Sequence, residues 1–142
     1  MIVALLAVAG GTGFKVVSEH LIGRDIDGLF MRALPRGKAA IVLSHPATAR
    51  SVRLIHERTY ASSSLQGLYS VAFAQIPDVA VEIEEPDGRT KIYLFDPKYK
   101  LAGTGSGDES QPTKVDMDKM HAYRDAIRDG EDRRIVEYAA VL

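Results

Sequence analysis

The chain has 142 residues, of which 46% are hydrophobic and 26% charged, and it contains no cysteine. This length favours one soluble globular domain with a substantial core, and we expect residues 1–142 to form a single domain. The lack of cysteine excludes a disulfide framework, a thiolate zinc site and a cysteine nucleophile, so oxygen or imidazole ligands would have to hold any metal. The composition is typical of a cytoplasmic protein.

The charge is divided unevenly along the chain. Residues 1–75 carry 8 Lys and Arg against 4 Asp and Glu, whereas residues 76–142 carry 10 against 15. The formal net charge of -1 therefore combines a basic half with an acidic half. A near-zero net charge argues against a nucleic-acid partner, since such domains are usually basic. An ordinary solvated surface can produce such an uneven charge distribution. A site that binds a metal ion together with a polyanion would need one.

The chain starts with a continuous apolar run, Ile2–Ala9, followed by Gly10-Gly11-Thr12-Gly13. The run is too short to span a bilayer and has no basic segment before it, so we expect no membrane association. A strand, a glycine-rich turn and an amphipathic helix would begin a dinucleotide-binding unit, but Val16 stands where the third glycine is needed. A dinucleotide-binding domain is therefore the third-ranked hypothesis, and a buried strand or helix followed by a turn is the plainer interpretation.

Alternating apolar and polar residues predict strands in the middle of the chain. Val79, Val81 and Ile83 alternate with polar residues, and the turn sequence Glu85–Gly88 follows them, so we expect an antiparallel hairpin. The predicted strands are, in chain order, Ala39–Leu43, Val52–Tyr60, Asp78–Glu84 and Thr90–Lys98.

A helix and a last strand are predicted in the C-terminal part. A glycine-rich loop ends at Pro112, and Thr113 to Asp116 fits the T-x-x-D variant of a capping box. The helical spacing of apolar residues continues from there, and Gly130 is a natural stop. We expect a helix over Lys114–Asp129 and a strand over Ile135–Leu142.

The predicted hairpin carries a group of residues with a clear chemical use. Asp78 begins its first strand, and Asp96 and Lys98 lie near the end of its second. Residues i and i+2 of a strand share a face, so Asp96 and Lys98 point the same way, about 6.5 to 7 Å apart. If the register brings Asp78 to the same end, two carboxylates and a carbonyl can hold a hard cation such as Mg²⁺. A lysine beside it can orient or deprotonate an attacking water, as phosphodiester cleavage requires.

This motif, Pro77-Asp78, 17 intervening residues and then Asp96-Pro97-Lys98, resembles that of the PD-(D/E)xK nuclease superfamily. The sequence F-D-P-K-Y-K at Phe95–Lys100 and the D-x-x-x-M-x-x-Y-x-D-A-I pattern from Asp116 to Ile127 are similar to those of an uncharacterised prokaryotic group. The resemblance covers roughly Val52–Leu142, so residues 51–142 would form the core and residues 1–50 a less certain N-terminal part. It implies an α/β fold with a restriction-endonuclease-like αβββαβ core, in which helices flank a mixed central sheet.

The resemblance also implies a function. The chain would be a DNA endonuclease that depends on Mg²⁺ or Mn²⁺ and hydrolyses phosphodiester bonds through a metal-bound water. Asp78 and Asp96 would ligate the metal, and Lys98 would position or activate the nucleophile. The alternative is a catalytically inactive DNA-binding or interaction domain of the same fold. A homodimer or a larger restriction or defence assembly is the expected form of association.

Four further residues are candidates for the site. On the predicted helix, Lys119 and Tyr123 share one side, where RecB-like nucleases carry a Gln-x-x-x-Tyr motif. Tyr123 fits that motif, whereas Lys119 replaces the glutamine; a core aromatic is the alternative for Tyr123. Glu82 shares the face of Asp78, or is a solvated strand residue. The superfamily often supplies another metal-binding acid from its first helix, and Glu19 is the candidate here, with a surface carboxylate as the alternative.

Overall fold

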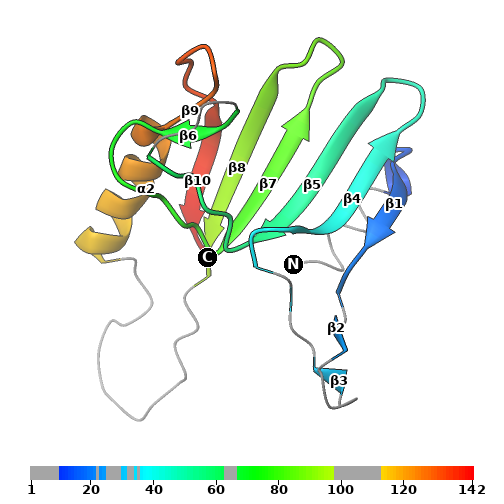
Figure 1. The fold of residues 1–142 in the computed structure, drawn as a ribbon, viewed down its shortest axis with the longest axis horizontal. Helices are drawn as coiled ribbons and strands as arrows, with labels where there is room; N and C mark the ends of the chain where they lie inside the picture. Colours follow the sequence, from blue (N-terminus) through cyan, green and yellow to red (C-terminus); the bar gives the residue numbers. More distant parts are fainter. Residues whose placement is uncertain are drawn as a thin grey trace.

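A six-stranded mixed sheet forms the centre of the molecule, with the order β1-β4-β5-β7-β8-β10 (Figure 1). The computed structural model describes residues 10–21, 23–24, 30–31, 34, 36–62, 67–97 and 113–142. The strands of the sheet are β1 (Lys15–Glu19), β4 (Ala39–His45), β5 (Arg50–His56), β7 (Val79–Glu84), β8 (Thr90–Asp96) and β10 (Val136–Val141). The remaining elements are β2 (Gly23–Arg24), β3 (Phe30–Met31), β6 (Tyr69–Ser70), α2 (Lys114–Ala126) and β9 (Ile127–Arg128).

Antiparallel and parallel pairing occur in the same sheet. From β1 to β8 every neighbouring pair is antiparallel, whereas β10 lies parallel to β8. Parallel neighbours need a crossover connection, and α2 lies in this crossover and contacts β10. The predicted strand, strand, helix, strand order is therefore confirmed.

Helix α2 begins as the sequence predicts but ends earlier. The capping box is present, because Thr113 Oγ1 accepts a hydrogen bond from Asp116 N at 3.3 Å and Thr113 N donates to Asp116 Oδ2 at 3.0 Å. The expectation that the helix continues to Asp129 and stops at Gly130 is wrong. Ile127 adopts an extended conformation, and β9 pairs with β6 there. A tertiary strand pairing thus overrides the local helical pattern.

The N-terminal part differs from the expectation of a first helix after Gly13. Lys15–Glu19 is strand β1, which pairs antiparallel with β4 at the sheet edge. The dinucleotide-binding hypothesis is wrong for the same reason, since a helix and a parallel strand would have to follow the glycines. The apolar run Ile2–Ala9 lies outside the described residues. No helix in the described ranges has both the length and the apolar character that a membrane span needs.

Strand β5 occupies Arg50–His56 rather than the predicted Val52–Tyr60. It ends where Glu57 adopts φ 49°, which breaks the extended conformation. The chain then continues to Tyr60, which forms a bridge with Gln75 and packs in the core.

The sheet buries one apolar cluster on each face because alternate residues of its central strands point to opposite sides. Ile92 and Leu94 of β8 are fully buried beneath α2, in contact with Met120 and Tyr123. Tyr93 and Phe95, between them in sequence, pack on the other face. The residues of this second cluster that are themselves buried are Ile41, Leu43, Leu54 and Val81.

The turn between β7 and β8 depends on a glycine. Gly88 has φ 81° and donates a hydrogen bond from its backbone N to Glu85 O at 2.9 Å, and a Cβ added at Gly88 would meet no other atom within 4 Å. We predict that Gly88→Ala lowers the free energy of unfolding by about 1 kcal/mol, because the left-handed conformation is strained for alanine. Urea denaturation measures this loss.

Gly130→Ala is the matched control. Gly130 also has open space around it but does not have a left-handed backbone. Its replacement should therefore leave the urea midpoint near that of the wild type. Equal losses in the two variants would show that the backbone conformation of Gly88 is not the cause.

Candidate functional site

The register of the central hairpin places Asp78 and Asp96 at the same end of the sheet. Val79 pairs with Phe95 in the last rung of this ladder, and Asp78 directly precedes Val79 while Asp96 directly follows Phe95, so both acids adjoin that rung. Neighbouring residues of an antiparallel pair have Cα atoms about 4.5 to 5.5 Å apart. Both carboxylates lie close enough to Tyr123 of α2 for their charges to raise its pKa, so both are on the side of the sheet that α2 covers. The structure therefore brings these two predicted site residues together.

Asp96 is a buried carboxylate with a cation beside it. Only 1% of the residue is exposed, and Lys119 Nζ donates a hydrogen bond to its Oδ2 at 2.7 Å. Lys119 comes from α2, and its side chain is 39% exposed. The replacement of the superfamily glutamine by lysine thus puts a positive charge directly on one of the candidate metal ligands.

The pKa of Lys119 reflects two opposing effects. Burial alone would lower it, but hydrogen bonds to Asp96 and Tyr123 outweigh burial and raise the pKa well above its usual range. The ammonium also lies 5.5 Å from the centre of the Tyr123 ring. Lys119 is therefore a permanent cation at this site.

Tyr123 connects α2 to the segment that leads into β7. It is 1% exposed, and its hydroxyl donates a hydrogen bond to Ile76 O at 3.2 Å, two residues before Asp78. Burial raises the pKa of Tyr123, Lys119 lowers it, and the nearby charges of Asp96 and Asp78 raise it further. The sequence left open whether Tyr123 is a core aromatic or a site residue. In the structure its ring is buried in the core, and its hydroxyl reaches the candidate site.

Glu82 is neither solvated nor beside Asp96. It is 1% exposed, and its two oxygens contact Arg58, Arg53 and the hydroxyl of Tyr60. It shares the face of Asp78, as predicted, but lies four residues further along β7. The interpretation of Glu82 as a solvated strand residue is therefore wrong, because two arginines hold its buried carboxylate.

A third acid, Glu57, lies at the same end of the sheet and was not singled out from the sequence. Its backbone N donates to Asp78 O at 2.9 Å, and the β5–β7 register sets it opposite Asp78. Its carboxylate pairs with Arg36 at 2.6 Å. No sequence signal pointed to it, because Glu57 falls inside the predicted strand Val52–Tyr60, and only the structure shows that β5 ends just before it.

Two other predicted site residues, Glu19 and Lys98, are not placed at this site by the described structure. Glu19 is an exposed residue of β1, and β4, β5 and β7 separate that strand from β8. At about 4.8 Å per strand this is roughly 19 Å, so the structure does not bring Glu19 to Asp96. The physical reason is that its segment forms an edge strand instead of a helix over the sheet. Lys98 lies outside the described residues.

The donor set at this end of the sheet consists of carboxylate oxygens. Mg²⁺ is commonly held by one or two carboxylates together with water and substrate phosphate, so Asp78 and Asp96 fit such an ion in number and chemistry. Within residues 36–62, 67–97 and 113–142 and the shorter described ranges, no group of three His, Cys, Asp or Glu side chains is placed to hold a metal. The fit therefore rests on the Asp78–Asp96 pair.

The comparisons with known proteins agree with this arrangement. A family model described as PD-(D/E)XK nuclease superfamily matches residues 2–142. The match includes the N-terminal residues that the motif resemblance left out. Neither the curated proteins nor the solved structures gave a match. With a family model over nearly the whole chain and a mixed sheet that fits the restriction-endonuclease-like fold, the chain belongs to the PD-(D/E)XK nuclease superfamily.

Proposed function

We propose that the protein is a DNA endonuclease that uses Mg²⁺ or Mn²⁺. Nucleases of this superfamily generally use divalent metal ions. The observation that carries the proposal is the β7–β8 register, which brings Asp78, just before β7, and Asp96, at the end of β8, to the same end of the sheet. A divalent ion held there would polarise the phosphate and favour ionisation of water.

The chain's own residues have separate tasks in this proposal. Asp78 and Asp96 would hold the metal ion, and Lys98 would position the attacking water. The water oxygen would bond to phosphorus as the bond to the leaving oxygen breaks, and the leaving oxygen would take up a proton from solvent. Lys119, 2.7 Å from Asp96, adds positive charge where negative charge develops on the phosphate. Tyr123 holds the backbone ahead of Asp78 through Ile76 O.

A noncatalytic DNA-binding domain of the same fold is the second candidate. One observation favours it: the ammonium of Lys119 already neutralises the buried carboxylate of Asp96. In that case the ion pair would replace the metal ion as a structural element. Cleavage and metal-binding measurements separate the two candidates.

We predict that Asp78→Asn, Asp96→Asn and Lys98→Ala each reduce nicking of supercoiled plasmid with Mg²⁺ or Mn²⁺ by at least about 100-fold, which corresponds to roughly 2.7 kcal/mol of lost transition-state stabilisation. Asp87→Asn is the matched control. Asp87 lies in the turn at the opposite end of the same hairpin, where it contacts Arg89, and asparagine can still accept the backbone hydrogen bond. Nicking that persists in all three site variants, with thermal unfolding unchanged, would contradict the proposal.

We predict that Lys119→Gln binds Mn²⁺ about fivefold more tightly than the wild type in the absence of DNA. Removing a positive charge about 4 Å from a cation removes roughly 1 kcal/mol of repulsion at high dielectric. Isothermal titration calorimetry measures the change directly. Lys114→Gln removes the same charge from the exposed first turn of α2 and should leave the affinity unchanged. No Mn²⁺ binding to either the wild type or Lys119→Gln would favour the noncatalytic candidate.

A further inference from the structure

A buried ion cluster lies on the face of the sheet that carries Asp78, and the proposed mechanism does not use it. At its centre is Glu82 of β7, which is 1% exposed. Oε1 accepts hydrogen bonds from Arg58 Nε at 3.0 Å and from the hydroxyl of Tyr60 at 3.2 Å. Oε2 pairs with Arg53 NH2 at 3.2 Å. One carboxylate therefore holds two guanidinium groups, and we call these four residues the Glu82 cluster.

Both arginines are fixed on their inner side and open to solvent on the outer side. Arg58 is held by Glu82 and lies 5.4 Å over the Tyr60 ring, yet 31% of its side chain is exposed. Arg53 pairs with Glu82 directly across the β5–β7 ladder, and 39% of its side chain is exposed. A guanidinium has five N–H groups, so one or two contacts to Glu82 leave several more for an outer acceptor.

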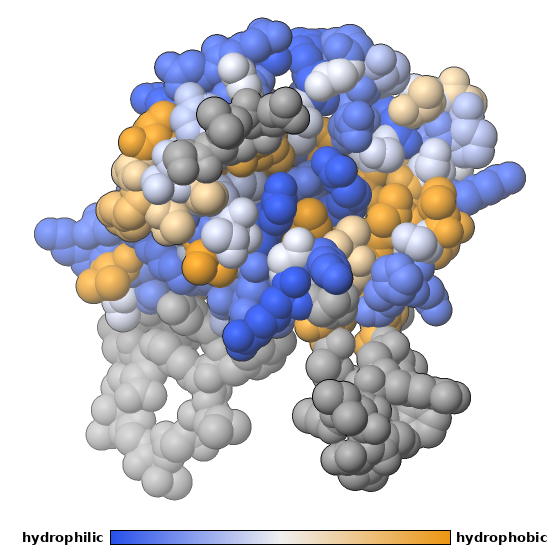
Figure 2. Space-filling view, in the orientation of Figure 1, coloured by the Kyte–Doolittle hydropathy of each residue, from blue (hydrophilic) through white to orange (hydrophobic). Residues whose placement is uncertain are grey.

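The Glu82 cluster carries a net charge of +1. Arg53 and Arg58 contribute two positive charges, and Glu82 contributes one negative charge. Tyr60 stays neutral, because burial and the adjacent Glu82 raise its pKa well above its usual range. Figure 2 shows hydrophilic side chains over the part of the sheet formed by β5 and β7. This positive surface is suited to an anion and not to an apolar ligand.

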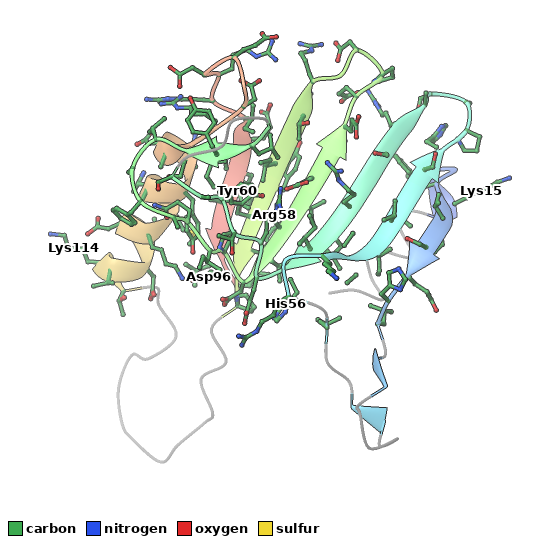
Figure 3. The ribbon with its side chains drawn as sticks, viewed as in Figure 1. Lys15, His56, Arg58, Tyr60, Asp96 and Lys114 are labelled. Atoms are coloured by element: carbon green, nitrogen blue, oxygen red, sulfur yellow. The ribbon has the colours of Figure 1, made fainter. Side chains whose placement is uncertain are left out.

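The Glu82 cluster is aligned with the proposed cleavage site. Asp78 directly precedes β7, and Glu82 lies four residues further along the chain, which is about 13 Å at 3.3 Å per residue. Arg58 follows Glu57, whose backbone N bonds to Asp78 O. In Figure 3 Arg58 and Tyr60 lie over the middle of the sheet, and Asp96 lies at the end of β8. A straight path along β7 therefore leads from the acid pair to the two arginines.

We infer that Arg53 and Arg58 bind a backbone phosphate of DNA, and that Glu82 orients both guanidiniums for that contact. The inference rests on the proposed function, because the DNA would place its cleaved bond at Asp78 and Asp96. The planar guanidinium matches a phosphate with two parallel hydrogen bonds. Each strand carries one phosphate per about 3.4 Å of helix axis, so a phosphate about 13 Å from the cleaved bond lies within a few nucleotides of it. Glu82 is a positioning residue, and the arginines make the contact.

The first test measures binding without cleavage. Fluorescence anisotropy of a labelled 20-base-pair duplex is followed in EDTA over a range of salt concentrations. Arg58→Gln and Arg53→Gln are each expected to raise Kd about five- to tenfold and to reduce the slope of log K against log salt by about 1. Arg58→Lys keeps the charge and should retain the salt slope while losing part of the affinity. Arg134→Gln is the control, since it removes an exposed arginine that pairs with Asp125 beside the far edge strand.

The variant Glu82→Gln tests whether Glu82 positions the arginines or affects DNA binding only through its charge. It raises the net charge of the cluster, so general electrostatic attraction alone would tighten DNA binding. If Glu82 orients the arginines, binding weakens instead, by about the same factor as in Arg58→Gln. Circular dichroism and thermal unfolding confirm that each variant is folded. Kd values and salt slopes within twofold of the wild type in both folded arginine variants would overturn the inference.

A second measurement keeps this inference distinct from the proposed nuclease function. Plasmid nicking by the wild type in Mg²⁺ or Mn²⁺ tests the nuclease function alone. If the wild type nicks DNA and Arg58→Gln does so with an unchanged KM, the phosphate contact fails while the nuclease stands. If the wild type does not nick DNA but the arginine variants lose binding, the contact stands and the cleavage assignment fails. A rise in KM that exceeds any fall in kcat supports both.

Discussion

The antiparallel pairing of β7 with β8 is the constraint on which the site depends. A slip of one residue in this pairing would move every side chain of one strand to the opposite face. Asp78 and Asp96 would then no longer adjoin the same rung, and Ile92 and Leu94 could not both remain under α2. The same apolar contacts that hold the sheet against the helix therefore fix the separation of the two carboxylates. A change of this register would therefore alter the packing and the site geometry together.

Helix α2 packs on one face of the sheet and contacts both strands of this hairpin. Lys119 contacts Asp96 at the end of β8, and Tyr123, one turn further along, contacts the backbone just before β7. Both side chains extend from a helix that the parallel β8–β10 crossover holds over the sheet. The buried positions Met120 and Tyr123 fix the rotation of the helix, and this rotation aims Lys119 at Asp96. The position of the cation thus follows from ordinary core packing.

Much of the fold could be predicted from local patterns, and the exceptions have physical causes. The hairpin and the start of α2 were predictable because alternation, turn chemistry and capping act over a few residues. The end of α2 could not be predicted, because Ile127 pairs as a strand residue with Ser70, which is distant in sequence. Likewise the segment of Glu19 becomes an edge strand because β4 offers it a partner.

The same distinction applies to the candidate site. Asp78 and Asp96 could be singled out because a motif and a hairpin lie within one short stretch of chain. The Glu82 cluster could not, since its arginines come from β5 and the segment after it, and their meeting with Glu82 depends on the β5–β7 register. Glu57 escaped notice for the same reason. Sequence patterns therefore identified Asp78, Asp96 and Lys119, whereas only the tertiary contacts revealed the arginine partners of Glu82.

The uneven charge of the sequence has a structural explanation in these contacts. The basic first half and the acidic second half meet along the β5–β7 ladder, where Arg53 and Arg58 pair with Glu82. Arg50 adds a third link, to Glu85, at 2.6 Å. A buried carboxylate is strongly destabilising without a counter-charge, so Arg53 and Arg58 stabilise Glu82 in the interior. Two arginines face one carboxylate, so the surface above Glu82 keeps a net positive charge. The end of the sheet at Asp78 and Asp96 is rich in carboxylates instead. Under the proposed function, a chain with almost no net charge would in this way place a surface for a phosphodiester next to a pair of carboxylates for its metal ion.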